Sequence, residues 1–306
     1  MASEGGYVRR PDFFIVGAPK SGTTSMAEYL RQHPDVFMAR GEPHFFGSDV
    51  RYNLEQMTEE EYLDCFSEAG NARRAGEKST WYLYSKRAAA EIKRFCPHAK
   101  IIIQIRNPVD MLYSLHGHLV YHSGREDIVD FEAALEAEED RRAGLRIPKH
   151  VRFPEHLFYS EIPLYTEQIK RYVDAFMWEQ IHIIVFDDLV SNTLREYRRV
   201  LRFLEVDDQF VPEFKVHNPQ RPKKSILLHR VASDSWIATT ARVLLPGTVR
   251  RPIGQMVSDW NTISTRPPMD KDVRRRLQEQ FAPEVERLSE LLDRDLSHWC
   301  DVKETL

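Results

Sequence analysis

Short apolar runs alternate with amphipathic stretches along the chain, and this alternation predicts the fold. The runs at 13–17, 101–105 and 181–186 are rich in Ile, Val and Phe, as strands buried on both faces are. The spacing of apolar positions predicts helices at 24–32, 85–95, 108–122, 161–178, 193–204 and 270–293. This order predicts an α/β fold with three layers, in which a mainly parallel central sheet is flanked by helices.

Two parts of the chain depart from this alternation. The stretch at about 123–157 is charged and has the pattern of an inserted helix with a mobile loop, which would be able to cover a bound acceptor. A solvated surface excursion is an equally good interpretation. The last part, about 226–306, has the pattern of helices and loops. We expect a single domain over residues 1–306, with a helical C-terminal part.

Composition and charge exclude several classes of protein. Of the 306 residues, 42% are hydrophobic and 29% are charged, which is enough apolar material for a packed core. The formal net charge of -4 argues against a nucleic-acid partner, because nucleic-acid-binding domains are usually strongly basic. Three widely spaced cysteines, Cys65, Cys96 and Cys300, indicate neither a disulfide framework nor a zinc site.

The start of the chain bears on its location in the cell. Its first apolar run begins at Phe13 and is too short for the core of a signal peptide or for a membrane span. We therefore expect a cytoplasmic protein without a transmembrane segment. A chain whose targeting segment has been removed is the alternative.

A strand, a tight turn and the start of a helix follow one another in residues 13–25. Gly17 and Gly22 allow backbone conformations that other residues avoid, while the unpaired N–H groups and the dipole of the helix favour an anion. Lys20 adds a positive charge within the turn. Further hydrogen-bond donors are the hydroxyl groups of Ser21, Thr23, Thr24 and Ser25. The pattern predicts a phosphate-binding loop.

A Walker loop is the main competing interpretation, because Gly17 and Gly22 have the spacing of its two glycines. In a Walker loop, however, lysine directly follows the second glycine, whereas Thr23 occupies that position here. A P-loop kinase is therefore the second hypothesis, and its magnesium would need the carboxylates of Asp187 and Asp188. A non-catalytic nucleotide-binding protein is the third.

The loop GAPKSGTTS, preceded by an apolar strand, resembles the 5'-phosphosulfate-binding loop of the sulfotransferase family. This resemblance implies a P-loop NTPase-like sulfotransferase fold and the transfer of a sulfuryl group to an acceptor hydroxyl. The donor would be 3'-phosphoadenosine-5'-phosphosulfate (PAPS), and the product adenosine 3',5'-bisphosphate (PAP), with no metal required. The residues implied to contact the donor here are Lys20, Ser21, Gly22, Thr23, Thr24 and Ser25.

A second strand ends in the element R-N-P-x-D, which is similar to the family's 3'-phosphate motif. The resemblance implies that Arg106, at the end of the strand, and Ser114, on the following helix, bind the 3'-phosphate; arginine binds phosphate through paired hydrogen bonds. Arg106 alone would also fit a structural ion pair. In the basic loop at 217–225, candidates for a further contact are Arg221, Lys223 and Lys224.

The segment from Glu42 to Phe46 resembles the E-x-H-F-F element of the heparan sulfate and related carbohydrate sulfotransferases. That resemblance implies that Glu42 is the catalytic base and that His44 is a neighbouring polar contact. Lys20 is expected to stabilise the negative charge on the leaving phosphate. The alternative for Glu42 is a surface carboxylate or a partner of Arg40.

Histidine is the alternative base, as in the small-molecule branch of the family. Three candidates lie on the helix after the R-N-P-x-D element: His116, His118 and His122. The segment EKSTWY at 77–82 also resembles a family element, E-K-S-P-x-Y, with threonine in place of proline. Candidates for contact with the substrate are Lys78, Trp81 and His118, although Trp81 also fits simple packing.

The acceptor cannot be identified from the sequence. The E-x-H-F-F element favours a sugar or polyol hydroxyl, whereas the acidic net charge argues against a polyanionic glycan. We therefore expect a bacterial-type enzyme that acts on a small molecule, lipid or glycan with a free hydroxyl. The sequence does not predict an oligomeric state.

Overall fold

The computed structural model describes residues 9–50, 57–149, 151–215 and 266–301. Contacts within the chain group its residues into two compact units. The larger unit contains the described parts of 1–112, 152–218 and 275–306, and the smaller unit those of 113–151 and 219–274. The single domain expected from the sequence remains a prediction.

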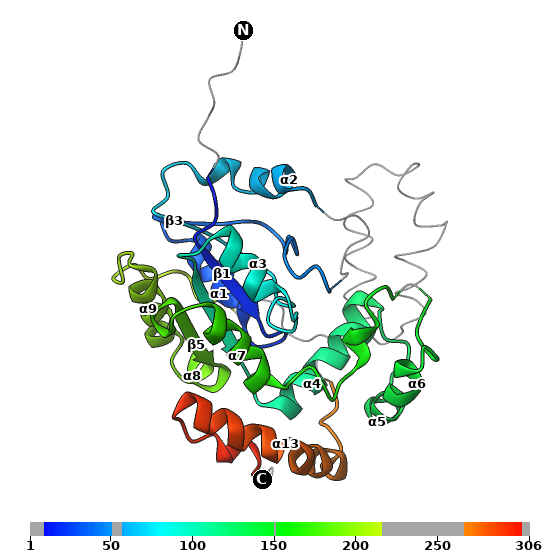
Figure 1. The fold of residues 1–306 in the computed structure, drawn as a ribbon. Helices are drawn as coiled ribbons and strands as arrows, with labels where there is room; N and C mark the ends of the chain where they lie inside the picture. Colours follow the sequence, from blue (N-terminus) through cyan, green and yellow to red (C-terminus); the bar gives the residue numbers. More distant parts are fainter. Residues whose placement is uncertain (1–8, 51–56, 150, 216–265, 302–306) are drawn as a thin grey trace, which may run out of the picture. The chain divides into compact units, whose positions relative to one another are not determined.

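A five-stranded sheet forms the centre of the larger unit (Figure 1). All neighbouring strands are parallel, in the order β2-β3-β1-β4-β5. The strands are β1 (Phe13–Gly17), β2 (Val36–Met38), β3 (Arg74–Lys78), β4 (Lys100–Ile105) and β5 (Ile181–Val185). The parallel sheet confirms the predicted α/β fold. The sequence pattern missed β2, which has three residues, and β3, whose sequence RAGEK is largely polar.

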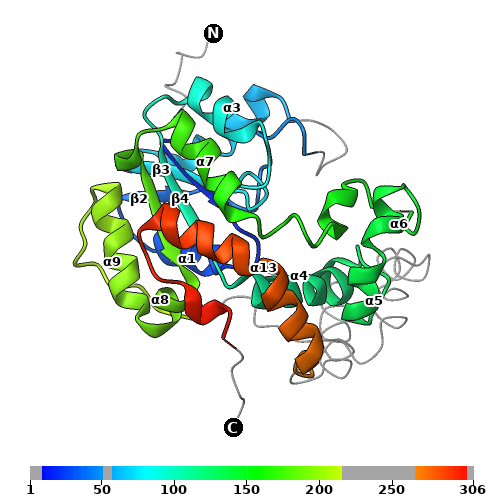
Figure 2. The same ribbon diagram turned by 60° about the horizontal axis from the view of Figure 1, so that its bottom comes forward.

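Helices cover both faces of this sheet (Figure 1, Figure 2). On one face lie α1 (Thr23–Arg31) and α9 (Thr193–Leu204), and on the other α3 (Ala88–Phe95) and α7 (Tyr165–Ala175). Side chains at alternate positions of the strands point to the same face, so Phe13 and Ile15 share one hydrophobic cluster with α1 and α9. This arrangement confirms the three predicted layers.

The remaining helices differ from the predicted spans mainly at their ends. The strand expected to end at 186 stops at Val185, because Phe186 begins α8 (Phe186–Ser191). The predicted helix 108–122 is α4 (Pro108–His118), followed by a π-helical turn at Leu119–Ser123. The others are α2 (Glu59–Asp64), α5 (Phe131–Glu136), α6 (Glu138–Arg142), α13 (Lys271–Leu292) and single 3-10 turns at Ser67–Ala69, Pro154–Leu157, Trp178–Gln180 and Ser297–Trp299.

The described part of α13 confirms the helix expected at 270–293. Asp270 caps its first turn, because Oδ1 accepts hydrogen bonds from the backbone N–H groups of Asp272 and Val273. Further along, α13 reaches α7 (Figure 2), where Oε1 of Glu284 accepts the N–H of Thr166 at 2.7 Å. None of the helices in the described ranges is both long enough and apolar enough to cross a bilayer.

Candidate active site

The turn between β1 and α1 requires glycine at both of its predicted positions. Gly17 has φ +146 and Gly22 has φ +87, a region that side chains with a Cβ rarely adopt. A Cβ on Gly17 would lie 2.6 Å from the carbonyl oxygen of Thr80, and one on Gly22 would lie 2.8 Å from Cδ2 of Leu189. Close packing therefore fixes the path of this loop, and α1 begins directly after it.

The alternation of side chains along β3 separates two neighbouring charged residues. Ile15 pairs with Lys78 and Phe14 with Glu77, so Lys78 shares the α1 face and Glu77 points to the opposite one. On the α1 face, Nζ of Lys78 lies 3.4 Å from Oγ1 of Thr24, in the first turn of α1. The end of β3 thus brings Lys78 to the predicted phosphate loop.

Glu42 lies at the same place and has four polar contacts. Its Oε1 lies 2.5 Å from Nζ of Lys78, and its Oε2 accepts hydrogen bonds from Oγ1 and the N–H of Thr80 at 2.9 and 3.2 Å. The Nε2 of His44 is 3.2 Å from Oε2. Burial alone would raise the pKa of Glu42, but His44 and Lys78 hold that pKa well below its usual range. Glu42 is therefore ionised and is not a free surface carboxylate.

Lys20 interacts electrostatically with this carboxylate, and Arg106 lies next to Lys20. Lys20 has φ 61, an uncommon backbone conformation for a residue with a Cβ, and its carbonyl oxygen accepts a hydrogen bond from Nη1 of Arg106 at 3.2 Å. Burial, followed by repulsion from Arg106, lowers the pKa of Lys20 to about 8, and Glu42 opposes that change. Lys20, Lys78 and Arg106 together form a cationic site suited to phosphate groups.

Arg106 stands directly after β4, next to the loop that follows β1 in the neighbouring strand. Its guanidinium lies over the ring of Phe186, 4.6 Å from the ring centroid, which orients the plane of the side chain. Parallel α/β sheets bind ligands at the carboxyl ends of their strands, where neighbouring connections run in opposite directions. The cationic site lies at that edge.

Comparison with known proteins identifies the family. A family model described as "Sulfotransferase domain" matches residues 10–229, which include the phosphate loop, Glu42, Lys78 and Arg106. The chain belongs to the sulfotransferase family.

Relatives of this sulfotransferase chain include enzymes named for glycan sulfation. It is 29% identical over 202 residues to heparan sulfate glucosamine 3-O-sulfotransferase 3B1 of Mus musculus, covering 66% of the chain and 48% of the relative. It is 34% identical over 206 residues to heparan sulfate glucosamine 3-O-sulfotransferase 6 of Homo sapiens, covering 67% and 55%. The chain spans about half the length of the curated relatives it matches.

A solved structure agrees with the fold over nearly the whole sulfotransferase chain. The crystal structure of a sulfotransferase from Alicyclobacillus acidocaldarius superposes with a TM-score of 0.72 at 30% sequence identity. The match covers 96% of this chain and 100% of that one. The family's α/β architecture is therefore shown for this chain as well.

Several predicted site residues of the sulfotransferase chain belong to the smaller unit. Ser114 is 6% exposed on α4. Nε2 of His116 lies 2.9 Å from the carbonyl oxygen of Ile128, and its Nδ1 lies 2.6 Å from Nη2 of Arg266. The rings of His118 and His122 are stacked with centroids 5.6 Å apart. Because His116 has both ring nitrogens engaged, it fits a structural role better than that of a base.

Trp81 is buried by packing, and the basic loop lies outside the described residues. Trp81 is only 4% exposed, and its ring packs against Phe153 and His156, which favours the packing interpretation. The candidates in the basic loop lie outside the described residues: Arg221, Lys223 and Lys224.

The carboxylates on which the kinase hypothesis depends are occupied within the larger unit. Oδ2 of Asp187 accepts a hydrogen bond from Nε1 of Trp299 at 2.6 Å, and Asp188 accepts two hydrogen bonds from Arg294. A magnesium ion would have to displace these partners. Among the described residues, no group of three His, Cys, Asp or Glu side chains is placed to hold a metal ion.

The sequence analysis missed the residues that hold the Glu42 segment in place. Thr80 contacts Glu42 through its N–H and its hydroxyl, as described above. On the other face, Ser79 accepts the N–H of His44 at 3.1 Å, and the hydroxyl of Tyr82 accepts the N–H of Phe46 at 3.2 Å. The resemblance of residues 77–82 to a family element was the available signal, but it did not indicate which side chains face Glu42.

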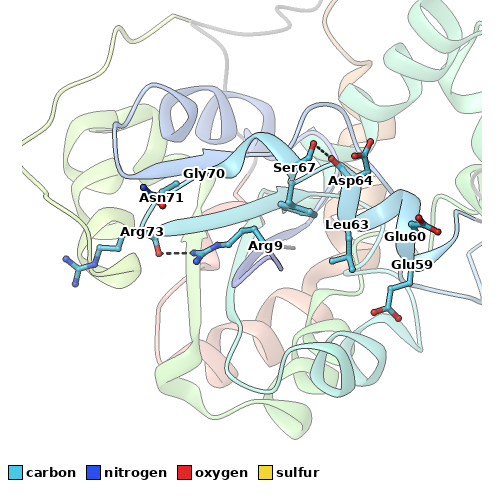
Figure 3. A pocket seen from close by; sticks show the side chains of 11 residues that line it. Arg9, Glu59, Glu60, Leu63, Asp64, Ser67, Gly70, Asn71 and Arg73 are labelled. Atoms are coloured by element: carbon cyan, nitrogen blue, oxygen red, sulfur yellow. Dashed lines mark hydrogen bonds between the residues drawn. The ribbon is translucent and has the colours of Figure 1, made fainter. Parts of the chain in front are cut away.

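A large pocket in the described residues lies away from this site (Figure 3). It has a volume of about 1040 Å³ and is lined by residues such as Leu63, Asp64 and Asn71. Nη2 of Arg9, just before β1, donates to the carbonyl oxygen of Arg73, just before β3, at 3.1 Å (Figure 3). The pocket therefore lies near the amino ends of the strands, opposite the phosphate loop.

Proposed function

We propose that this protein transfers the sulfuryl group of PAPS to an acceptor hydroxyl. The observation that carries the proposal is the double contact of Lys78, whose Nζ lies 2.5 Å from Glu42 and 3.4 Å from Thr24. One ammonium therefore joins the proposed base to the first turn of the phosphate-binding helix. The acceptor hydroxyl at Glu42 and the donor phosphosulfate at the loop would therefore lie next to each other.

Each proposed role follows from the charge and position of a side chain. Glu42 takes the proton of the acceptor hydroxyl as the acceptor oxygen attacks sulfur and the bond from sulfur to the bridging oxygen breaks. The ammonium of Lys20 stabilises the negative charge that develops on the leaving phosphate. The proton ends on Glu42, the sulfuryl group on the acceptor, and PAP leaves.

The low pKa of Glu42 requires its partners to change during this reaction. Burial raises the pKa of Glu42, but the contacts with His44 and Lys78 hold it well below the usual range. While both contacts persist, Glu42 is a weak base. A phosphate in the loop next to Thr24 would share the charge of Lys78. Donor binding would therefore make Glu42 a stronger base.

The donor contacts are proposed along the same edge of the sheet. The 5'-phosphosulfate would bind the loop through the residues from Lys20 to Ser25, and the 3'-phosphate would bind Arg106, with Ser114 and the basic loop as further contacts. This assignment is supported by the glycine geometry and by the cationic site. No step in it requires a metal ion.

For the acceptor we propose a hydroxyl of a small molecule, lipid or glycan. Two relatives are named for 3-O-sulfation of glucosamine in heparan sulfate, which makes a sugar hydroxyl the first class to test. The formal charge of -4 disfavours a long polyanionic acceptor. Uncharged sugars and polyols should therefore be screened before sulfated glycans.

Calorimetric titration of the full chain tests the donor site. PAP without metal should bind more tightly than ATP with magnesium, and transfer from PAPS should proceed in the presence of a chelator. Preference for magnesium-ATP, or no binding of PAP, would reject the sulfotransferase activity and favour the kinase. Tight binding of PAP without transfer to any acceptor class would instead favour a nucleotide-binding protein.

A further inference from the structure

A segment close to the end of the described chain is joined to the helix that supports Arg106. Trp299, in the 3-10 turn Ser297–Trp299, is 2% exposed, and its Nε1 donates to Oδ2 of Asp187 at 2.6 Å. Asp187 follows Phe186, the residue whose ring lies under the guanidinium of Arg106. The indole N–H therefore fixes the first turn of α8 next to the arginine.

The backbone of the same tryptophan is joined to the other side of Arg106. Its carbonyl oxygen accepts the side-chain N–H of Asn107 at 3.0 Å. The side-chain oxygen of Asn107 in turn accepts the N–H groups of Val109 and Asp110 at 2.9 and 3.3 Å, which caps the first turn of α4. Asn107 directly follows Arg106 in the sequence, so this contact restrains the backbone of the arginine.

These two contacts meet at one buried residue. The side chain of Trp299 restrains the ring on which Arg106 stacks, and its carbonyl oxygen restrains the backbone next to Arg106. A guanidinium binds phosphate through two hydrogen bonds with a fixed geometry, so its orientation affects affinity strongly. A buried indole N–H ordinarily has a hydrogen-bond partner, and here that partner is Asp187, the residue that directly follows Phe186.

We propose that Trp299 is a positioning residue for the 3'-phosphate of the donor and acts by orienting Arg106. This inference rests on the proposed function, because it takes Arg106 as the residue that binds the 3'-phosphate. It assigns the segment 294–299 a role in distinguishing nucleotides with a 3'-phosphate from those without one. Arg294 supports the same turn of α8 through its two hydrogen bonds to Asp188.

Trp299→Phe tests the proposal because it keeps an aromatic ring and removes the N–H donor. Dissociation constants are measured by calorimetry for PAP and for adenosine 5'-monophosphate, which lacks the 3'-phosphate. We expect PAP to bind about tenfold more weakly, while the monophosphate changes less than about twofold. Trp178→Phe is the matched control, because Trp178 is 46% exposed in the same unit and should leave both constants unchanged.

Equal weakening of both nucleotides, or no weakening of either, would overturn the proposal. If Trp299→Phe lowers thermal stability, its effect on the dissociation constant of PAP is measured again in an Arg106→Ala background. The effect on PAP binding should vanish there, because the residue that Trp299 orients is absent. Additive losses in that double variant would also overturn it. If the wild-type protein binds PAP no better than the monophosphate, the proposed 3'-phosphate site itself fails, which is a separate result.

Discussion

The ammonium of Lys78 lies 2.5 Å from Oε1 of Glu42, although the two residues come from different segments of the chain. Strand pairing explains the contact, since Lys78 ends β3 and pairs in register with Ile15 of β1. The segment of Glu42 follows β2, which is the other neighbour of β3. The sheet therefore places the proposed base beside the phosphate loop.

Glu42→Gln should remove most turnover and leave the binding of PAP close to that of the wild type. The amide keeps the shape of the side chain but cannot take a proton, and a positioned base contributes about 10² to 10⁴ in rate. The change also releases Lys78 from its ion pair, so affinity for the bisphosphate should not fall. The measurements are kcat with PAPS and the dissociation constant of PAP.

Glu59→Gln is the control for this change, because Glu59 is an exposed carboxylate paired with Arg10 near the amino ends of the strands. The kcat of Glu59→Gln should equal that of the wild type. Normal turnover in Glu42→Gln would instead move the role of base to a histidine, and the candidates would then be His118 and His122.

The activity should fall at alkaline pH because Lys20 loses its proton. Burial and then Arg106 lower the pKa of Lys20 to about 8, so its ammonium is present below that pH and lost as the pH rises through it. The value of kcat/KM for PAPS should therefore decrease above about pH 8. Bound phosphate stabilises the ammonium, so the decrease in kcat should lie at higher pH.

Two substitutions separate charge from position at Lys20. Lys20→Arg stays charged over this range, so its kcat/KM for PAPS should not change with pH up to about pH 10. The rate should be lower than in the wild type, because a guanidinium is larger than an ammonium and planar. Lys20→Ala should weaken donor binding and turnover at every pH. An alkaline decrease that persists in Lys20→Arg would assign the ionisation to another group.

Arg106→Ala should weaken the binding of PAP by about 1.5 to 3 kcal/mol, which corresponds to about 10- to 150-fold, because a charge-assisted contact is lost. Adenosine 5'-monophosphate should be affected far less. Arg10→Ala is a matched control, since Arg10 and Arg106 each lie 4.6 Å from the centroid of a phenylalanine ring. A similar loss with Arg10→Ala would show that the loss with Arg106→Ala does not report a specific phosphate contact.

The turn between β1 and α1 and the place of Arg106 after β4 were predictable from the sequence because their signals are local. A buried strand, two glycines and a helix start lie within thirteen residues at 13–25 and require no knowledge of distant contacts. Arg106 follows an equally clear strand. The core strands and most helices were also predictable, because the periodicity of their apolar residues is a strong local signal.

The partners of these residues were not predictable, since they depend on tertiary contacts. The direction in which Glu77 and Lys78 point follows from the register of β3, a strand whose polar sequence gave no sign of burial. Likewise, Asp187 would hold magnesium only under the alternative kinase hypothesis, whereas the fold gives it Trp299, more than one hundred positions away, as a partner. The roles of all the predicted site residues remain predictions, including those of Arg221, Lys223 and Lys224.

Glu77→Gln should reduce both stability and turnover without changing the binding of PAP. Glu77 is fully buried and accepts hydroxyl hydrogen bonds from Tyr62, Ser79 and Tyr82 at 2.8, 2.7 and 3.0 Å. Ser79 and Tyr82 also accept backbone N–H groups of the segment that follows Glu42. An amide N–H facing these hydroxyls should cost about 1 to 3 kcal/mol in the free energy of unfolding.

Urea unfolding and steady-state kinetics check this prediction. The loss should appear in kcat, because the displaced segment carries the proposed base, while the dissociation constant of PAP stays close to that of the wild type. Wild-type kcat in a destabilised Glu77→Gln protein would show that the buried carboxylate supports the fold without positioning Glu42.

His116 should make the protein less stable in acid. Burial is the main cause that lowers its pKa from 6.5 to about 4, and Arg266 beside Nδ1 adds to the effect. The unfolded chain therefore binds a proton at His116 below about pH 6.5, whereas the folded chain binds it only below about pH 4. The contribution of neutral His116 to the free energy of unfolding is complete above pH 6.5 and is lost as the pH falls between these values.

His116→Phe, which cannot titrate, isolates this contribution. At pH 7 the variant should be about 1 to 3 kcal/mol less stable than the wild type, because the hydrogen bond to Ile128 and the contact with Arg266 are lost. The difference in the free energy of unfolding should shrink as the pH approaches 4, because only the wild type has a histidine that must stay neutral in the folded chain. Urea unfolding at several pH values measures it, and a difference that stays constant between pH 7 and 4 would show that His116 is not held neutral by the fold.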